Sequence, residues 1–148
     1  MIRKAEIKDI SRIAEILVFD KRINFRPIFR NDDYSFNELR VLKVAEEYSR
    51  PETLDNIFVY DDGIVKGLIH MEETEIAELY VDNFFQNQGI GGKLMEYAIR
   101  EHNADRLWVI EKNVKAVRFY EAHGFRLSGE RKCEEGTEVF VGLMVRDF

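Results

Sequence analysis

The chain has 148 residues, of which 45% are hydrophobic and 34% charged, a composition typical of one globular domain spanning residues 1–148. A chain of this size can bury a core without disulfides or a structural metal, and its single cysteine, Cys133, excludes a disulfide-rich secreted scaffold. The net charge of −6 argues against nucleic-acid binding, and no apolar run reaches the roughly 18 residues of a membrane span. We therefore expect a cytoplasmic protein that has no signal peptide and binds neither nucleic acid nor membrane.

The N-terminal part is predicted to form one strand and two helices. The strand covers residues 2–7, and Asp9 caps a first helix whose apolar residues keep helical spacing up to Leu17. The sequence Ser-Phe-Asn-Glu at 35–38 is a capping box, which begins a second helix that ends before Pro51.

The rest of the chain alternates between the period of strands and that of helices. An Asp-Gly turn at 62–63 and a second turn at 72–74 make an antiparallel meander of three strands. A glycine-rich helix runs from Gly89 to about Glu101, another lies between Asn113 and Gly124, and the last hairpin turns at 133–136. This order predicts an α/β fold with a mixed sheet covered by helices. The predicted strands are 56–60, 64–71, 75–81, 106–110, 125–130 and 138–145.

The strongest chemical signal is the glycine-rich start of the helix at residue 89. Gly89, Gly91 and Gly92 each cost about 1 kcal/mol of helix propensity relative to alanine. Such a cost is expected where backbone N–H groups must approach a ligand, and a helix N-terminus favours a phosphate group. A glycine-rich helix start without a ligand is the alternative.

Two familiar phosphate-binding loops do not fit this segment. A Walker A loop needs glycine five residues before Gly92 and serine or threonine after Lys93, but the chain has Asn87 and Leu94 there. A dinucleotide-binding loop that starts at Gly89 needs glycine where Leu94 stands.

Two segments together resemble the GNAT superfamily of N-acetyltransferases. Residues 86–91, Gln-Asn-Gln-Gly-Ile-Gly, match the family's Gln/Arg-x-x-Gly-x-Gly/Ala acetyl-CoA loop. Residues 113–125 match its Asn-x-x-Ala-x-x-Phe-Tyr-x-x-x-Gly-Phe segment. The match covers 79–125, and the order of the flanking strands agrees. The resemblance implies a mixed, mostly antiparallel sheet with splayed central strands, flanked by about four helices.

The resemblance also implies an activity, the transfer of an acetyl group from acetyl-CoA to a primary amine by direct attack in a ternary complex. No metal is implied, and the three histidines lack metal-ligand spacing. Tyr120 would protonate the leaving thiolate; the alternative is that it is a core aromatic. Glu75 would act as the base; the alternatives are that it is a solvated surface charge and that an ordered water or a neighbouring glutamate, Glu72, Glu73 or Glu78, takes the proton. Trp108 stands where some relatives carry a glutamate base. Acetyl-CoA would contact the backbone of Leu79, Tyr80 and Val81, the loop residues Asn87, Gln88, Gly89, Ile90, Gly91 and Gly92, and Asn113.

The acceptor is expected to be an amine of a small molecule or of a protein or peptide. Residues 19–34 and the acidic run 130–138 are expected near its entrance, with solvated hairpin charge as the alternative for the acidic run. A silent acyl-CoA-binding module of the same fold and a different phosphate-binding domain are the two alternative functions. Tyr120 favours the enzyme, because binding alone needs no hydroxyl group there. The sequence leaves the oligomeric state open, and a homodimer is one of the expected states.

Overall fold

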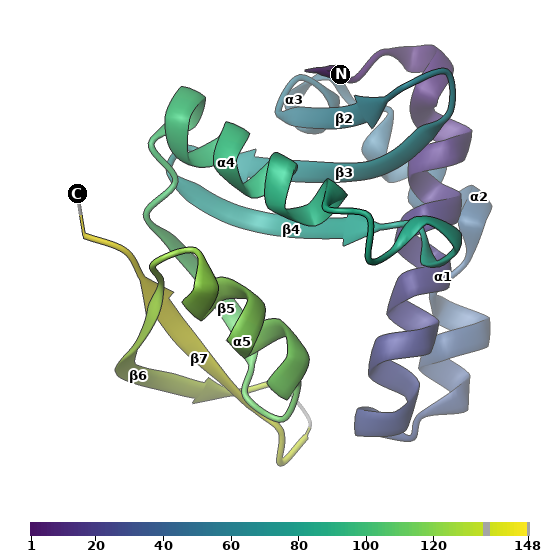
Figure 1. Ribbon diagram of the computed structural model, residues 1–148. Helices are drawn as coiled ribbons and strands as arrows, with labels where there is room; N and C mark the ends of the chain where they lie inside the picture. Colours follow the sequence, from purple (N-terminus) through teal and green to yellow (C-terminus); the bar gives the residue numbers. More distant parts are fainter. Residues whose placement is uncertain (135–136, 148) are drawn as a thin grey trace.

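The computed structural model describes residues 1–134 and 137–147, which form a seven-stranded sheet with helices on both faces (Figure 1). The strands lie in the order β1-β2-β3-β4-β5-β7-β6, and only β4 and β5 are parallel neighbours. The strands are β1 (Ile2–Lys4), β2 (Ile57–Asp61), β3 (Val65–Glu72), β4 (Glu75–Val81), β5 (Arg106–Ile110), β6 (Arg126–Cys133) and β7 (Phe140–Val145). The helices are α1 (Ile10–Phe29), α2 (Val41–Tyr48), α3 (Pro51–Leu54), α4 (Ile90–His102) and α5 (Val114–Ala122), with short turns η1 (Ile7–Asp9), η2 (Asp33–Glu38) and η3 (Asn83–Phe85).

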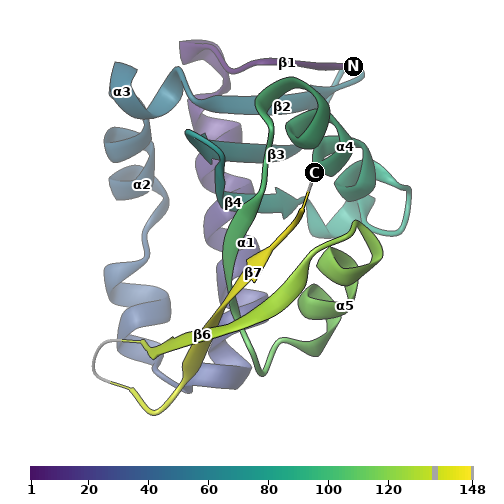
Figure 2. The ribbon, with the colours of Figure 1, turned by 90° about the vertical axis from the view of Figure 1, so that its left-hand side faces the viewer.

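The middle of the sheet is buried on both faces, whereas the edge strand β6 is exposed. Leu68 of β3 packs with residues of α1, whereas the next residue, Ile69, packs with residues of α4, because successive side chains of a strand point to opposite faces. Helices α1 and α2 thus cover one side, and α4 and α5 lie on the other (Figures 1 and 2). None of the described helices has both the length and the apolar character needed to cross a bilayer.

The sheet opens at its centre, between β4 and β5. These strands pair only at Glu75 with Arg106 and at Ile76 with Leu107, and then diverge (Figure 1). On the other side of β4 the register to β3 shifts, because Met71 faces Ile76 but His70 faces Glu78, which leaves Ala77 as an extra residue. Such a bulge bends a strand and increases its twist, which is consistent with β4 turning away from β5. The predicted mixed sheet with splayed central strands is confirmed.

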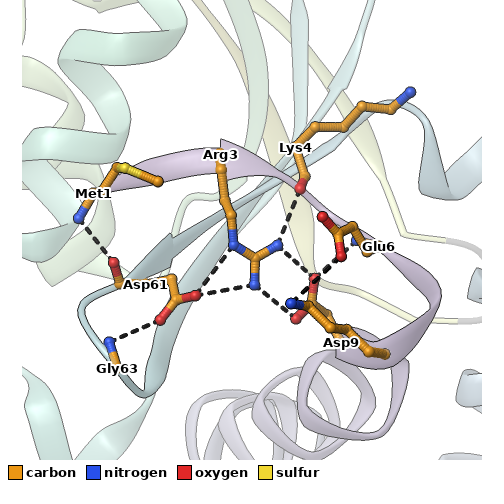
Figure 3. A network of polar contacts seen from close by, with 8 residues as sticks. Met1, Arg3, Lys4, Glu6, Asp9, Asp61 and Gly63 are labelled. Carbon is orange, nitrogen blue, oxygen red and sulfur yellow. Dashed lines mark hydrogen bonds and ion pairs between the residues drawn. The ribbon is translucent and has the colours of Figure 1, made fainter.

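A polar network anchors the N-terminus to the sheet edge (Figure 3). Arg3 donates to both carboxylate oxygens of Asp9 at 2.8 and 2.9 Å and to Asp61 Oδ2 at 3.0 and 3.1 Å. Asp9 also accepts from the backbone N–H of Glu6 at 2.8 Å. Its side chain therefore does not cap α1, as the sequence suggested, but holds the preceding turn against β1 and the β2–β3 hairpin.

The largest errors of the sequence prediction lie between residues 19 and 54. Helix α1 continues through Pro27, which lacks the N–H for one backbone hydrogen bond, and its last residue is Phe29; Arg30 follows in a left-handed conformation with φ 53°. The segment 35–38 is no capping box; it lies in the π-helical turn η2, where the Ser35 carbonyl accepts from Arg22 Nε at 2.8 Å, and α2 begins only at Val41. The short helix α3, which starts at Pro51, was not predicted.

The remaining boundaries agree to within a few residues. The predicted strands 75–81 and 106–110 coincide with β4 and β5. Strand β6 runs three residues beyond the predicted end at 130, to Cys133. The turn predicted at 133–136 falls partly on residues 135–136, which lie outside the described part of the chain.

Candidate active site

The site begins at the end of β4, where the contacts of Asp82 hold the backbone in place. Its Oδ1 accepts from the Phe84 N–H at 2.8 Å and so caps the turn η3. Its Oδ2 forms an ion pair with Arg12 Nη2 of α1 at 2.7 Å, and its backbone N–H donates to the Lys66 carbonyl of β3 at 2.8 Å. The glycine-rich loop therefore starts from a point that is tied to both α1 and the sheet.

Two residues in left-handed conformation turn the chain into α4. Asn87 has φ 63° and Gly89 has φ 80°, and an ideal Cβ at Gly89 meets no atom within 4 Å. Backbone conformation therefore explains the glycine at 89, since L side chains rarely adopt it. The bond from Lys93 N–H to the Gly89 carbonyl, at 3.1 Å, is the first of the helix, and N–H groups before it are free of intrahelical partners.

Gly91 has a different reason to be glycine. A Cβ at this position would lie 3.4 Å from two ring carbons of Phe119 and 3.7 Å from Val81 Cγ2. The missing side chain lets the first turn of α4 approach α5 and the end of β4. A Cβ alone at 91 would make ordinary van der Waals contact with Phe119, whereas a longer side chain would have to displace the ring or bend away from it.

A cavity of ≈ 310 Å³ lies between four elements: the middle of α1, the end of β4, the start of α4 and the first turns of α5. It brings together most of the residues predicted to bind acetyl-CoA, and Tyr120 lines the same cavity. Gln88 and Glu75 do not line it. The predicted residues in its wall are Leu79, Tyr80, Val81, Asn87, Gly89, Ile90, Gly91, Gly92, Asn113 and Tyr120.

The end of β4 offers a backbone edge to this cavity. Leu79, Tyr80 and Val81 pair with β3 on one side, but β5 has already diverged on the other. The Val81 carbonyl accepts from Gln86 Nε2 at 3.3 Å. An extended ligand can therefore add to this strand in the way that a further strand would, through main-chain hydrogen bonds.

Tyr120 projects from α5 into an apolar part of the cavity. Its ring lies 5.3 Å from that of Phe119 and 6.3 Å from that of Phe125, between ring centroids. No hydrogen bond joins its hydroxyl group to another described residue, and burial raises the pKa of Tyr120 to about 12. The phenol is therefore protonated at neutral pH and can donate its hydrogen to a group bound in the cavity.

Asn113 combines the two roles considered for it. Its Oδ1 accepts from the Ala116 N–H at 3.3 Å and caps α5, and the residue also lines the cavity. Lys115, the second residue of the same helix, adds a positive charge to the wall. The start of α5 therefore presents a polar amide and a cation beside the start of α4.

The acidic residues of β4 lie in different surroundings. Glu75 is at the closed end of the opening, paired with Arg106 of β5, and the structure does not bring it to the cavity. Glu78 is largely buried on the side of α1 and α2, where it accepts from the Tyr48 hydroxyl and lies 3.4 Å from Lys21 Nζ. Burial alone would raise its pKa, but His70, Lys21 and Tyr48 outweigh burial and hold the pKa of Glu78 below its usual value.

Four polar residues of the cavity wall were not among the predicted site residues: Gln86, Lys115 and, from α1, Asp20 and Asn24. The two residues of α1 lie farthest from the motif in sequence. They continue the apolar face that starts with Ile13 and Leu17, at intervals of three to four residues. A carboxylate on the buried face of a helix is the signal that would have revealed the site, because burying a charge without a partner is costly.

A second cavity, of ≈ 850 Å³, lies on the other side of the α1 wall, where Lys21 and Phe25 face η2 and the β6–β7 hairpin. Its described lining is mixed in charge and rich in aromatic rings. The predicted segments 19–34 and 130–138 both contribute to it, although residues 135–136 lie outside the described chain. Its lining includes Phe29, Tyr34, Glu38, Lys112, Glu134 and Glu138.

Comparison with known proteins points to the same family as the two sequence motifs at residues 86–91 and 113–125. A family model described as "Acetyltransferase (GNAT) domain" matches residues 32–141. A probable N-acetyltransferase of Mycobacterium tuberculosis, Rv2775, is 42% identical over 64 residues, which are 42% of this chain and 37% of that protein. An uncharacterized N-acetyltransferase of Archaeoglobus fulgidus is 28% identical over 142 residues, covering 84% of this chain and 92% of the relative.

The fold agrees with solved structures as well. The crystal structure of the PaiA N-acetyltransferase of Thermoplasma acidophilum, in complex with coenzyme A, superposes with a TM-score of 0.69 at 19% identity, over all of this chain and 98% of that one. The family match covers the loop, the central opening and α5, which build the cavity together with α1, a helix outside the matched range. The chain belongs to the GNAT family of acetyltransferases.

Proposed function

We propose that this protein is an N-acetyltransferase that moves the acetyl group of acetyl-CoA to a primary amine by direct attack. The observation that carries the proposal is the cavity in which the glycine-rich start of α4, the free edge of β4 and the Tyr120 hydroxyl meet. The coenzyme A bound to the Thermoplasma relative supports the same ligand here.

Different residues of the cavity are suited to the pyrophosphate, the pantetheine arm and the thioester of acetyl-CoA. The N–H groups at the start of α4 suit the pyrophosphate, because a helix N-terminus favours negative charge, and Lys115 adds a cation nearby. The backbone of residues 79–81 suits the amide groups of the pantetheine arm. Tyr120, at the apolar end, would donate its proton to the sulfur as the thioester bond breaks.

The amine acceptor is proposed to approach through the second cavity. Phe25, Phe29 and Tyr34 offer apolar contact, and Glu38 and Glu138 offer acceptors for a cationic amine. Lys21 and Lys112 also line this cavity, so the acceptor is expected to carry an acidic or neutral polar group beside its amine. A small molecule or the end of a peptide fits this description. The alternative of an acyl-CoA-binding module without catalysis predicts that no amine is acetylated.

Binding of acetyl-CoA is the first test. At a ligand concentration one hundred times Kd, linkage adds about 2.7 kcal/mol to the free energy of unfolding, or roughly 5–11 °C in Tm. We expect this shift to persist in EDTA, since the proposed contacts are N–H groups and side chains rather than a metal. An unchanged melting curve at millimolar acetyl-CoA would contradict the proposal.

Transfer is the second test. Amines of several classes, including polyamines, amino acids, aminoglycosides and peptides with free N-termini, are incubated with protein and acetyl-CoA, and thiol release is followed. We expect amine-dependent release of coenzyme A from at least one class, with the acetylated product visible by mass spectrometry. Binding of acetyl-CoA without transfer to any amine would favour the silent module instead.

A further inference from the structure

Asp20 differs from the other buried acidic residues of this protein. The residue is only 3% exposed, yet no hydrogen bond or ion pair joins its side chain to a described residue. Since no fully enclosed side-chain oxygen of the described chain lacks a partner, the Asp20 carboxylate keeps some open space beside it. By contrast, the buried Asp9 binds Arg3, and the buried Asp82 binds Arg12 and Phe84 N–H. Asp20 lines the smaller cavity, which is therefore the open space available to its carboxylate.

A buried carboxylate without a partner is unfavourable for folding, so its presence calls for a ligand that supplies the partner. Asp20 shares its cavity with Tyr120, the residue proposed to protonate the sulfur of coenzyme A. The carboxylate and the phenol therefore belong to the wall of one small space, one from α1 and the other from α5. This is the space in which the thioester and the attacking nitrogen must meet.

The chemistry of the acceptor requires such a group. A primary amine with a pKa of ~10.4 is neutral in only about one molecule in 2,500 at pH 7, and only the neutral form has an electron pair for attack. The other two acidic candidates suit this task less well. Glu78 already binds Tyr48, His70 and Lys21, and Glu75 is at the far end of β4.

We infer that Asp20 takes the proton from the acceptor amine, an inference that rests on the acetyltransferase function proposed above. The ammonium group passes one N–H proton to the carboxylate, and the freed electron pair forms the C–N bond to the acetyl carbonyl carbon. The C–S bond breaks and its electrons leave with sulfur, which takes a proton from Tyr120. The second proton from nitrogen restores Tyr120, and Asp20 releases its own proton to solvent, so the products are an amide, a thiol and one proton.

The surroundings of Asp20 suit a proton acceptor at neutral pH. Burial and, to a lesser extent, the neighbouring Asp82 raise the pKa of Asp20 to about 7, against the opposing effect of Arg12 on the same helix. The other titratable groups in the described wall of the cavity are Tyr80 of β4 and Tyr120 and Lys115 of α5, whereas α2 and β3 contribute none. A carboxylate with a pKa near the working pH accepts a proton more readily than an ordinary aspartate.

The substitution Asp20→Asn tests the inference, because it keeps the size of the side chain and removes its basicity. With the best amine of the panel, we expect kcat to fall about 10²–10⁴-fold, while the Tm shift caused by acetyl-CoA is retained. In the wild type, kcat/KM should decrease below an apparent pKa near 7, and this decrease should vanish in the variant. Glu15→Gln, which removes an exposed carboxylate from the same helix, is the control and should keep the wild-type rate.

A second measurement needs no acceptor. Carboxyl ¹³C NMR of the protein alone, with the Asp20→Asn spectrum to assign the signal, should show Asp20 titrating near pH 7. A titration near pH 4 would overturn the inference, and so would a normal kcat with an unchanged pH profile. A rise in KM at constant kcat would also overturn it, because Asp20 would then bind the amine without taking its proton. Failure of the proposed function is a different result, in which the wild type itself neither binds acetyl-CoA nor acetylates an amine.

Discussion

At the scale of single residues, the site depends on polar groups that lack partners inside the protein. The hydroxyl of Tyr120 and the carboxylate of Asp20 both line one cavity, and neither is bonded to another described residue. Elsewhere the buried acids are paired, as Asp9 with Arg3 and Glu78 with Tyr48. The contrast indicates that these two residues are placed for a ligand rather than for stability.

The role of the tyrosine can be separated from its packing by removing the hydroxyl group alone. In Tyr120→Phe we expect turnover to fall about 10²–10⁴-fold, because the thiolate loses its positioned proton donor. Affinity for acetyl-CoA and Tm should stay close to the wild type, since the lost hydroxyl has no described protein partner. Steady-state rates and melting curves check both expectations.

Tyr97→Phe is the matched control, because Tyr97 stacks on Phe58 and His102 at 5.3 and 5.5 Å and lies outside the cavity wall. The control should retain wild-type turnover. If Tyr120→Phe turned over at a near-normal rate with an acceptor for which chemistry is rate-limiting, water would be the source of the proton.

At the scale of elements, the start of α4 combines strained backbone with free N–H groups. Asn87→Asp adds a negative charge to the cavity wall without changing the size of the side chain, and aspartate tolerates the left-handed conformation. We expect it to raise the Kd for acetyl-CoA about ten- to hundredfold, through repulsion of the pyrophosphate. Isothermal titration at two salt concentrations measures this, and the effect should shrink at high salt.

The same helix offers the control at its other end. Asn103 is also left-handed, with φ 53°, and it is exposed after the last turn of α4. Asn103→Asp should leave the Kd unchanged. Equal affinity of both variants would place the pyrophosphate away from this loop.

Gly91 is less suitable for such a test, because a side chain at that position contacts the ring of Phe119.

The elements show what sequence patterns can and cannot predict. Strands β4 and β5 were predicted with their observed boundaries, because clear turns bound the buried runs. The second half of α1 was missed, since Asp20 and Asn24 interrupt its apolar face. Those residues line the cavity, so the pattern failed where function replaced core packing. The loop and Tyr120 were found through a motif, whereas Asp20 is brought to them only by tertiary structure.

At the scale of the whole molecule, the raised pKa of Asp20 makes stability depend on pH. The folded protein binds a proton on Asp20 below about pH 7, whereas the unfolded chain binds it only near the ordinary value of 3.8. The free energy of unfolding therefore increases as pH falls from 7 towards 4, because the folded state takes up a proton on Asp20. Above pH 7 the folded state carries the full cost of the buried charge.

Asp20→Asn should consequently be more stable than the wild type at pH 8, by roughly 2–4 kcal/mol or about 5–10 °C in Tm. The difference should shrink to roughly a third at pH 5, where Asp20 is protonated in the folded protein but still ionised in the unfolded chain. Thermal unfolding of both proteins at the two pH values checks this. The same difference at pH 5 and pH 8 would show that Asp20 does not titrate in this range.

The narrow junction between β4 and β5 has a mechanical consequence. Two residue pairs join the arm of β1–β4 to the arm of β5–β7, so the sheet has a natural hinge there. A molecule bound along β4 and against α5 spans that hinge and couples the two arms. Hydrogen exchange should therefore report two units of unequal protection in the free protein, which merge into one cooperative unit when acetyl-CoA is bound.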